Sequence, residues 1–381
     1  MQTLDSIHRH LEQKLRERFS ENKYRRLSCN SGMADFCSND YLGFARSPAL
    51  QAKIRDELGK HPGYPAGATG SRLLSGNSTY AEHLEEEIAL FHHAQAGLIF
   101  NSGYAANLGL FSAIARRGDT VICDELAHAS IIDGIRLSGA NRYTFSHNDT
   151  GSLEQKLKQA EKGPGRIFIA VESIYSMDGD KAPLEKITSL TEKHNAALIV
   201  DEAHAGGIFG KNGRGLVPLW GLEEQVFARI YTFGKALGSH GAIITGSKTL
   251  KDYLVNFARP LIYTTALPFH NLASIKCAYE LLIDRTGLQK ELDAKIALFK
   301  TLAKGIRGII PMDGPIQTVT VPGNKAVREA AGQLQASGLD VRPILSPTVP
   351  EGKERIRICL HLYNTEEEIK KLTGLLTTIL T

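Results

Sequence analysis

Short apolar runs alternate with amphipathic stretches along most of the chain. Runs such as 120–123, 167–171 and 196–200 contain four or five apolar or β-branched residues and are followed by an acidic residue, which is typical of buried strands. The segment from Ser78 to about His92 instead places apolar residues three or four positions apart, which predicts a helix. Together these patterns predict an α/β fold, in which ligands bind at the carboxyl ends of the strands.

The two ends of the chain carry their own patterns. Ile7, Leu11, Leu15 and Phe19 recur every fourth residue, which predicts one apolar face of a helix that serves as a packing arm. Beyond about Pro268, a helical stretch leads to a smaller unit. Its expected elements are strands at 316–321, 339–344 and 355–362, a helix at 326–336, and a last helix with Thr365 and Glu368 in a capping box.

Length and composition limit the class of protein. The 381 residues are many for one core and suggest a large domain with a smaller companion. A net charge of +4 is spread along the sequence, which argues against a nucleic-acid partner. The N-terminus lacks the apolar core of a secretory signal, and no run approaches the ~18 apolar residues of a membrane span, so we expect a soluble, cytoplasmic protein. The cysteines are far apart and are expected to be reduced thiols: Cys29, Cys37, Cys123, Cys277 and Cys359.

Candidate chemistry appears at the ends of two predicted strands. The strand at 196–200 is followed by Asp201, and a later apolar run leads to Lys235, a single lysine among small residues. A lysine can hold the aldehyde of pyridoxal phosphate as a Schiff base, and a carboxylate can keep its pyridine nitrogen protonated so that the ring accepts electrons. The pair favours this cofactor. By itself it is weak, because most lysines are solvated and strands ending in Asp-Glu are common.

Other segments have an ordinary reading beside a functional one. Gly103 and Tyr104 begin a predicted helix whose N–H groups suit a phosphate, although by themselves they are explained more simply by a plain glycine turn. His128 follows a strand in a loop, where a histidine is more often structural. Asn39 lies in a turn-forming cluster that reads as an Asx turn. A hydroxyl at Ser176 suits either the cofactor's phenolic oxygen or a turn cap.

Several of these segments occur together and in a characteristic order. The motifs are Asn39-Asp40-Tyr41-Leu42-Gly43, His128-Ala129-Ser130, Ser176-Met177-Asp178-Gly179-Asp180, Asp201-Glu202-Ala203-His204 and Thr232-Phe233-Gly234-Lys235. In order and rough spacing the chain resembles the α-oxoamine synthases, pyridoxal-phosphate enzymes that join an amino acid to an acyl thioester. The resemblance runs from about Asn39 to Arg357, and co-ordered motifs are far more specific than any one of them.

The resemblance implies an overall architecture. We expect a fold-type-I, aminotransferase-like α/β protein, with a large domain built on a mostly parallel seven-stranded sheet between helices and a smaller α/β C-terminal domain. The expected divisions are an N-terminal helical arm and segment at 1–45, a large cofactor-binding domain at 46–268, and a linking helix with the small domain at 269–381.

The resemblance also implies roles around the cofactor. Lys235 is the reactive amine, Asp201 pairs with the pyridine nitrogen, and His128 stacks on the ring. His204 and Ser176 reach the phenolic oxygen, with His204 lending acid catalysis or only orienting that oxygen. The phosphate is held by the amides of Gly103 and Tyr104 and the hydroxyl of Thr232. Tyr263 and Thr264 reach the phosphate of a partner subunit, so the active site is expected to be shared across a homodimer. No metal is expected.

Substrate roles follow from the same resemblance. Asn39 helps hold the amino acid, Arg357 binds its carboxylate with Arg355 as the reserve, and Arg25 or Arg26 meets the acyl donor. The segment around Thr348 is also expected at the substrate. Ser146-His147-Asn148-Asp149, residues 67–76 and residues 346–350 favour the branch that condenses L-alanine with a pimeloyl thioester, carried by coenzyme A or a carrier protein. The branches that use glycine or serine remain alternatives, because residues 205–207 and Tyr104 differ from the residues that are common in the family at these positions.

Two readings from other classes fit less well. Asp201-Glu202-Ala203-His204 also spells a helicase box, but the nearest phosphate-loop-like stretch, 241–249, has one residue too many and follows the box. A binding protein that kept the fold and lost the chemistry is disfavoured, because Asp201, His204, Thr232 and Lys235 are all present.

Overall fold

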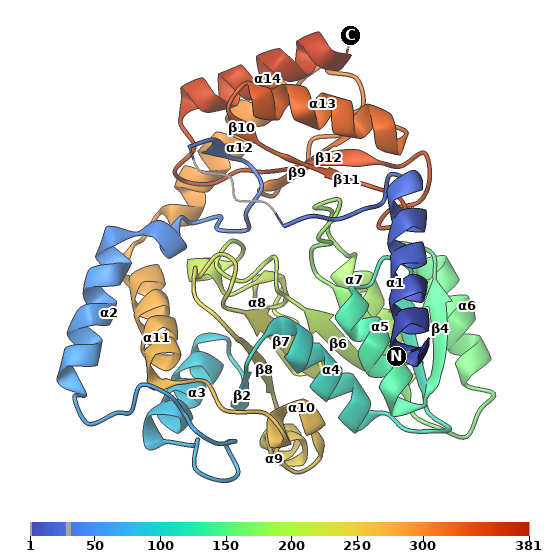
Figure 1. Cartoon of the computed structure of the whole chain (residues 1–381). Helices are drawn as coiled ribbons and strands as arrows, with labels where there is room; N and C mark the ends of the chain where they lie inside the picture. Colours follow the sequence, from blue (N-terminus) through green and yellow to red (C-terminus); the bar gives the residue numbers. More distant parts are fainter. Residues whose placement is uncertain (1, 28–31, 381) are drawn as a thin grey trace. The chain divides into compact units, whose positions relative to one another are not determined.

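The computed structural model describes residues 2–27 and 32–380, which form two compact units (Figure 1). The larger unit comprises Asn39–Ser176 and Asp180–Leu292, and the smaller one comprises Met1–Ser38, Met177–Gly179 and Asp293–Thr381. The predicted divisions lay at 45/46 and 268/269 instead. Helix α11 (Phe269–Asp284) belongs to the larger unit because it packs against α2 (Pro48–Lys60) and α3 (Thr79–Phe91).

A seven-stranded sheet forms the centre of the larger unit. Its strands, in spatial order, are β2 (Ala96–Phe100), β8 (Ala242–Gly246), β7 (Ala228–Thr232), β6 (Ala197–Asp201), β5 (Ile167–Glu172), β3 (Thr120–Asp124) and β4 (Asn141–Phe145). Only β8 runs antiparallel to its neighbours, and the pairs from β7 to β4 are all parallel. The mostly parallel, seven-stranded sheet expected from the sequence is therefore confirmed.

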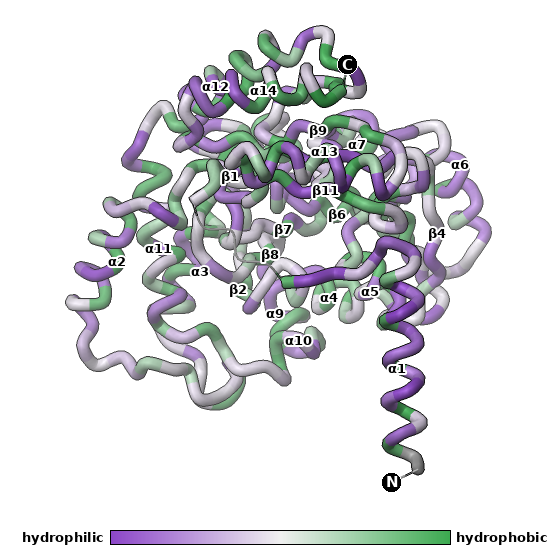
Figure 2. Tube along the Cα trace, turned by 45° about the horizontal axis from the view of Figure 1, so that its top comes forward, coloured by the Kyte–Doolittle hydropathy of each residue, from purple (hydrophilic) through white to green (hydrophobic). Residues whose placement is uncertain are grey.

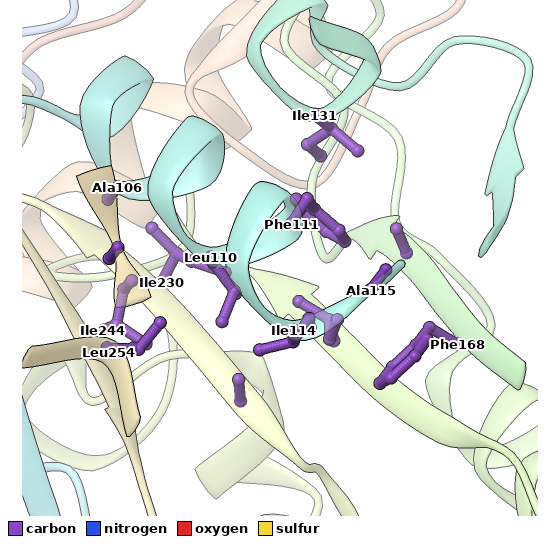
Figure 3. Packing of buried hydrophobic residues seen from close by; sticks show 14 of the residues in the cluster. Ala106, Leu110, Phe111, Ile114, Ala115, Ile131, Phe168, Ile230, Ile244 and Leu254 are labelled. Atoms are coloured by element: carbon purple, nitrogen blue, oxygen red, sulfur yellow. The ribbon is translucent and has the colours of Figure 1, made fainter. Parts of the chain in front are cut away.

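Both faces of this sheet are covered by helices. On one face, side chains of α4 (Gly103–Ile114) and α5 (Ala129–Ser138) form the main apolar core with the strands, and Figure 3 shows Leu110 and Ile114 of α4 in this core with Ile230 and Ile244. Alternate strand residues point to the opposite face. They are buried as well, because α6 (Thr150–Ala160) and α7 (Leu184–Lys193) contact β3, β4 and β6.

Shorter elements complete the larger unit. They are the helices α8 (Leu216–Leu219), α9 (Lys248–Phe257) and α10 (Arg259–Ile262) and the 3₁₀ turns η1 (Phe44–Arg46), η2 (Lys211–Gly213) and η3 (Glu223–Gln225). Helix α12 (Leu288–Leu302) begins in the larger unit and ends in the smaller one. The helix predicted from Ser78 is confirmed as α3, with the Ser78 side chain accepting a hydrogen bond from the Ala81 amide.

The smaller unit contains an antiparallel sheet in the order β11 (Arg342–Ile344), β12 (Arg355–Cys359) and β9 (Ile316–Thr320). The single strand predicted at 339–344 is divided, because β10 (Leu339–Asp340) pairs instead with β1 (Ala34–Asp35). Helices α13 (Asn324–Ala336) and α14 (Glu366–Leu380) complete the unit. The predicted capping box is confirmed: the Glu368 amide donates to Thr365 Oγ1 (3.1 Å) and the Thr365 amide to Glu368 Oε2 (3.0 Å).

The N-terminal helix forms as predicted, as α1 (Gln2–Ser20). Within one chain its apolar face is not covered, since Ile7, Leu11, Leu15 and Phe19 are 51–65% exposed. Figure 2 shows α1 as mostly hydrophilic with isolated apolar positions. No helix among the described residues is both long and apolar enough to cross a membrane. Cys37, Cys123, Cys277 and Cys359 form no disulfide, and Cys29 lies outside the described residues.

Candidate active site

A tight turn after β7 presents Lys235. The Gly238 amide donates to Lys235 O (2.9 Å), and the Ser239 amide donates to Phe233 O (2.8 Å). Gly238 has φ +57°, and a Cβ atom at this position would lie 2.1 Å from the Ala45 backbone nitrogen. Only glycine fits this conformation so close to neighbouring backbone. The turn therefore holds Lys235 in a fixed place at the carboxyl end of the sheet.

The Lys235 side chain begins a chain of hydrogen bonds. Its Nζ lies 2.7 Å from His204 Nε2, and His204 Nδ1 lies 2.8 Å from the Tyr41 hydroxyl. Tyr41 donates in turn to Asn39 Oδ1 over 3.1 Å. With the tyrosine proton used in this way, His204 Nδ1 donates to the Tyr41 oxygen and Nε2 accepts from the lysine. Three predicted site residues, Lys235, His204 and Asn39, are thus brought together.

Asp201 is fixed at the end of the neighbouring strand β6. The residue is 6% exposed, its Oδ1 accepts from the Ala203 amide (2.9 Å), and its Oδ2 accepts from Asn107 Nδ2 (2.8 Å). Two directed hydrogen bonds on a buried carboxylate leave little freedom for rotation. Such a fixed carboxylate is suited to the role expected for Asp201, which is to accept a hydrogen bond from the pyridine nitrogen of pyridoxal phosphate.

His128 caps the N-terminus of α5 and is linked to the same region. Its Nδ1 lies 2.7 Å from Ser130 Oγ, and its backbone amide donates to Glu172 Oε1 over 2.8 Å. The residue is exposed to solvent, which leaves room for a ring to stack on it. Burial of part of the side chain lowers its pKa, while the negative charge of Asp201 opposes this effect. A neutral imidazole follows at pH 7.

Glu172 ends β5, directly opposite Asp201 in the register of the sheet. It is 3% exposed, and burial, followed by the nearby Asp201 charge, raises its pKa to about 8. The protonated carboxyl group adds no second negative charge beside Asp201 at neutral pH. Its Oε1 remains available to accept the His128 amide.

The beginning of α4 offers a cradle for an anion. Ser102 caps the helix by accepting from the Ala105 amide (3.1 Å), so the helix starts at Gly103 with its N–H groups unpaired within the helix. A Cβ atom at Gly103 would lie 2.6 Å from Thr232 Cγ2, which shows how closely the two residues approach. Tyr104 is half exposed, and its hydroxyl donates to Asp133 (2.6 Å). The predicted phosphate ligands Gly103 and Thr232 are therefore adjacent.

The remaining predicted site residues of the larger unit are Ser176, Tyr263 and Thr264. Thr264 Oγ1 accepts from Asn101 Nδ2 (3.3 Å), two residues before Gly103, while Tyr263 is 72% exposed. Ser176 follows the isolated bridge between Ile174 and Lys181 and is the last residue of its segment in this unit. Among the described residues, no cluster of three or more histidine, cysteine or acidic side chains is arranged to hold a metal ion.

The other predicted substrate residues belong to the smaller unit. Arg355 donates from Nη1 to Asp178 and from Nε to Lys353 O (2.9 Å). Arg357, on the central strand β12, is 9% exposed, and its Nη1 contacts Cys359 Sγ at 3.0 Å. Arg25 and Thr348 are exposed to solvent. The guanidinium group of Arg355 is thus engaged by a carboxylate within its own unit.

Sequence reasoning gave no role to four residues that connect the site: Tyr41, Asn107, Ser130 and Glu172. Glu172 had a usable signal, because it directly follows the apolar run predicted as a strand at 167–171. Asn107 is a polar residue one turn after Gly103 in a mostly apolar helix. Tyr41 and Ser130 stood within quoted motifs, but nothing in the spacing showed which residues they contact.

Comparisons with curated proteins point to one group. The profile of the family Aminotransferase class I and II matches residues 31–375. An 8-amino-7-oxononanoate synthase from Emericella nidulans is 46% identical over 375 residues, covering 92% of this chain and 89% of that protein. One from Trichlorobacter lovleyi is 39% identical over 348 residues, with 90% and 88% covered.

Solved structures agree. A serine palmitoyltransferase with pyridoxal phosphate is 28% identical with a TM-score of 0.85, covering 91% of this chain and 87% of that one. The 8-amino-7-oxononanoate synthase of Francisella tularensis is 27% identical with a TM-score of 0.78, covering 92% and 98%. With its fold, its strand-end lysine and these relatives, the chain belongs to the aminotransferase class I and II family and, within it, to the α-oxoamine synthases.

Proposed function

We propose that this chain is a pyridoxal-phosphate-dependent acyltransferase that makes 8-amino-7-oxononanoate in biotin biosynthesis. It joins L-alanine to a pimeloyl thioester of coenzyme A or a carrier protein, and it releases CO2 and the free thiol. The observation that carries the proposal is the contact of Lys235 Nζ with His204 Nε2 at 2.7 Å, at the end of the sheet where Asp201 is also held. The 46% identity to a named synthase supports the choice of product.

The residues present fit the cofactor. The close approach of Gly103 to Thr232 leaves a side-chain-free helix start for a phosphate, and Asp201 is a buried, oriented carboxylate for a ring nitrogen. His128 supplies a neutral, exposed ring for stacking, and Ser176 and His204 serve the phenolic oxygen. When bound, the cofactor supplies an electron-accepting ring that stabilises negative charge at the α-carbon of the amino acid.

Lys235 moves the proton in this scheme. Its Nζ takes the α-proton of the amino acid, while the hydrogen bond to His204 Nε2 directs the amine lone pair. The α-carbon then forms a bond to the thioester carbonyl carbon, and the thiolate leaves. After the carboxylate departs as CO2, Lys235 returns a proton to the same carbon. His204 orients the lysine and the phenolic oxygen, since Tyr41 fixes its other nitrogen.

The substrate contacts in this proposal follow the family resemblance. Arg357 binds the amino-acid carboxylate in preference to Arg355, because Arg355 pairs with Asp178. A guanidinium group can grip a carboxylate with two parallel hydrogen bonds. Asn39, held by Tyr41, contacts the amino acid, and Arg25 and Thr348 meet the acyl donor.

The active site is shared across a homodimer in this proposal. The Ala266 amide donates to Gly70 O (2.9 Å), which joins the segment 67–76, with glycines at 67, 70 and 76, to the segment that carries Tyr263 and Thr264. On this surface Tyr263 is 72% and Leu74 is 85% exposed. Exposed apolar side chains of this kind support a protein interface. From there the Thr264 hydroxyl reaches the phosphate of the partner.

Thiol release tests the function. Purified protein with pyridoxal phosphate is mixed with one acyl donor and one amino acid, in every combination. The donors are pimeloyl-, acetyl- and palmitoyl-CoA, and the amino acids are L-alanine, glycine and L-serine. We expect rapid release of free thiol only with L-alanine and pimeloyl-CoA. Lys235→Ala abolishes release, whereas Lys186→Ala, an exposed lysine on α7, does not. Release only with glycine or serine would move the substrate to another branch of the family.

A further inference from the structure

The geometry points to Asn107 as a positioning residue that sets Asp201 and His128 in one common orientation. This inference rests on the proposed function, since it concerns the two side chains assigned to the ring of the cofactor. Asn107 touches neither substrate nor cofactor in this account. It acts through the two residues that do.

Asn107 lies between these side chains and is almost fully buried. Its Nδ2 donates to Asp201 Oδ2 (2.8 Å) and to Ser130 Oγ (3.0 Å), and the residue is 2% exposed. Ser130, which is 0% exposed, lies 2.7 Å from His128 Nδ1. One amide group thus connects a strand end, through a serine, to the N-terminus of a helix.

The orientation of the amide is forced by charge. Both N–H bonds of Asn107 are used, and its Oδ1 has no hydrogen-bond partner among the described residues. Turning the amide over would place Oδ1 against the Asp201 carboxylate, which carries no proton to donate. Buried polar atoms without partners are rare because they are costly. The hydrogen bond from Asn107 to Asp201 therefore forms although Asn107 Oδ1 is left without a partner among the described residues.

Ser130 passes the constraint to His128. Because Asn107 donates to its oxygen, the Ser130 hydroxyl proton is directed to His128 Nδ1, and the Ser130 amide points at the same nitrogen (3.2 Å). Nδ1 is therefore an acceptor, and the ring proton lies on Nε2. The other charged groups facing His128 are Asp201, Lys235 and Asp133.

The helices are built to allow this contact. A Cβ atom at Gly134 of α5 would lie 2.9 Å from the Asn107 carbonyl oxygen and 2.9 Å from Phe111 Cβ. Glycine therefore lets α5 approach α4 at the level of Asn107. Ile131 of α5 and Phe111 of α4 lie in the same core beside this contact (Figure 3). The close packing of α4 against α5 thus brings the Asn107 amide within hydrogen-bond distance of Ser130 Oγ.

Two variants separate the two links. Asn107→Leu keeps approximate volume and removes both hydrogen bonds, whereas Ser130→Ala keeps the bond to Asp201 and breaks only the path to His128. The readouts are the dissociation constant of pyridoxal phosphate from the apoprotein, measured by fluorescence, and the titration of the His128 ring in the apoprotein, followed by NMR. Thermal melting checks that each variant is folded.

We expect Asn107→Leu to weaken cofactor binding by about tenfold or more and to change the titration of the His128 ring, because the Ser130 hydroxyl that contacts Nδ1 is no longer held by Asn107. Ser130→Ala is expected to change the titration of His128 and to leave cofactor affinity within about threefold. A folded Asn107→Leu protein with wild-type affinity and wild-type His128 titration would overturn the inference.

A second variant covers the case in which Asn107→Leu does not fold. Asn107→Asp has the same shape but places a like charge beside Asp201, so affinity is expected to fall at pH 8 and to recover toward pH 5 as the new carboxyl group gains a proton. Unchanged affinity at pH 8 would contradict the positioning role. If wild-type protein fails to bind pyridoxal phosphate, the proposed function is wrong, and the His128 titration in the apoprotein still tests Asn107 separately.

Discussion

At the scale of single residues, the site depends on what holds each reactive group. Lys235 contacts His204, His204 contacts Tyr41, and Tyr41 contacts Asn39 in one line. A lysine without such partners samples many rotamers, and its lone pair points toward a substrate only part of the time. The line of hydrogen bonds therefore contributes orientation, which is a large part of catalysis by positioned groups.

Removing one hydroxyl tests this line. Tyr41 is fully buried (0% exposed), so Tyr41→Phe keeps the packing and deletes the hydroxyl that contacts His204 Nδ1 and Asn39 Oδ1. We expect kcat to fall by about tenfold, with cofactor affinity unchanged, because His204 loses its fixed orientation. Steady-state kinetics and a cofactor titration measure the two quantities. Tyr80→Phe, which deletes a hydroxyl bonded to Glu57 outside the site, is the matched control, and equal kcat values would refute the role.

A second residue-scale prediction concerns pH and stability. His147 lies between Asp124 (2.9 Å) and Asp180 (2.7 Å), and although its own partial burial opposes protonation, hydrogen bonds to these carboxylates raise its pKa to about 10. The stabilisation is fully present below the ordinary value of 6.5 and is lost as pH rises through about 10.

The difference in unfolding free energy between wild type and His147→Gln is therefore expected to be about 2 kcal/mol at pH 6 and to shrink toward zero above pH 10. Urea unfolding at several pH values measures it. A difference that stays constant from pH 6 to pH 10 would show that the charge of His147 is not involved.

The sequence suggests candidates for the reactive residues more readily than for the residues that hold them. Lys235 and Asp201 could be predicted because their residue types and their places at strand ends are local properties of the chain. Asn107 binds Asp201 across 94 positions, and Tyr41 binds His204 across 163. Such contacts depend on how strands and helices pack, which spacing along the chain does not contain.

At the scale of elements, α4 has two tasks. Its first residue, Gly103, forms the anion cradle with Thr232, and Asn107, one turn later, reaches Asp201. One helix thus places groups for both ends of the proposed cofactor. The sequence predicted the start of this helix and most strands, because their periodicity is strong. It missed the break between β10 and β11, where two short segments pair with different sheets.

Adding one methyl group to the cradle tests the element. Gly103→Ala places a Cβ atom 2.6 Å from Thr232 Cγ2, so one of the two must move out of the phosphate site. We expect cofactor affinity to fall by about tenfold or more, since the helix amides and the Thr232 hydroxyl no longer converge. Gly332→Ala in α13 meets nothing within 4 Å and is the control. Cofactor titration compares them, and equal affinities would place the phosphate elsewhere.

At the scale of the whole molecule, the proposed site needs two chains. Thr264 is hydrogen-bonded to Asn101 in its own chain, and Tyr263 beside it is largely exposed. If the Thr264 hydroxyl serves the partner's phosphate, then each active site combines Lys235 of one subunit with Thr264 of the other. Fold class and family could be predicted from the sequence, but the residues that join two copies follow only from the resemblance.

Mixed dimers distinguish an active site built from residues of two subunits from one built within a single subunit. Lys235→Ala and Thr264→Glu are each expected to be inactive, the second because a carboxylate repels phosphate. After unfolding and refolding as an equal mixture, half of the dimers contain one intact site, so activity should return to about a quarter of wild type. Each protein refolded by itself is the control. No recovery in a mixture shown to contain mixed dimers would mean that Thr264 acts within its own subunit.

The most direct test of the central claim is the site of attachment of the cofactor. The protein is mixed with pyridoxal phosphate, its visible absorption is recorded, the adduct is reduced with borohydride, and the labelled peptide is identified by mass spectrometry. The account predicts a new absorption band and a label on Lys235, both absent in Lys235→Ala and retained in Lys186→Ala. A label on another lysine, or no band with wild-type protein, would contradict the assignment of Lys235 as the reactive amine.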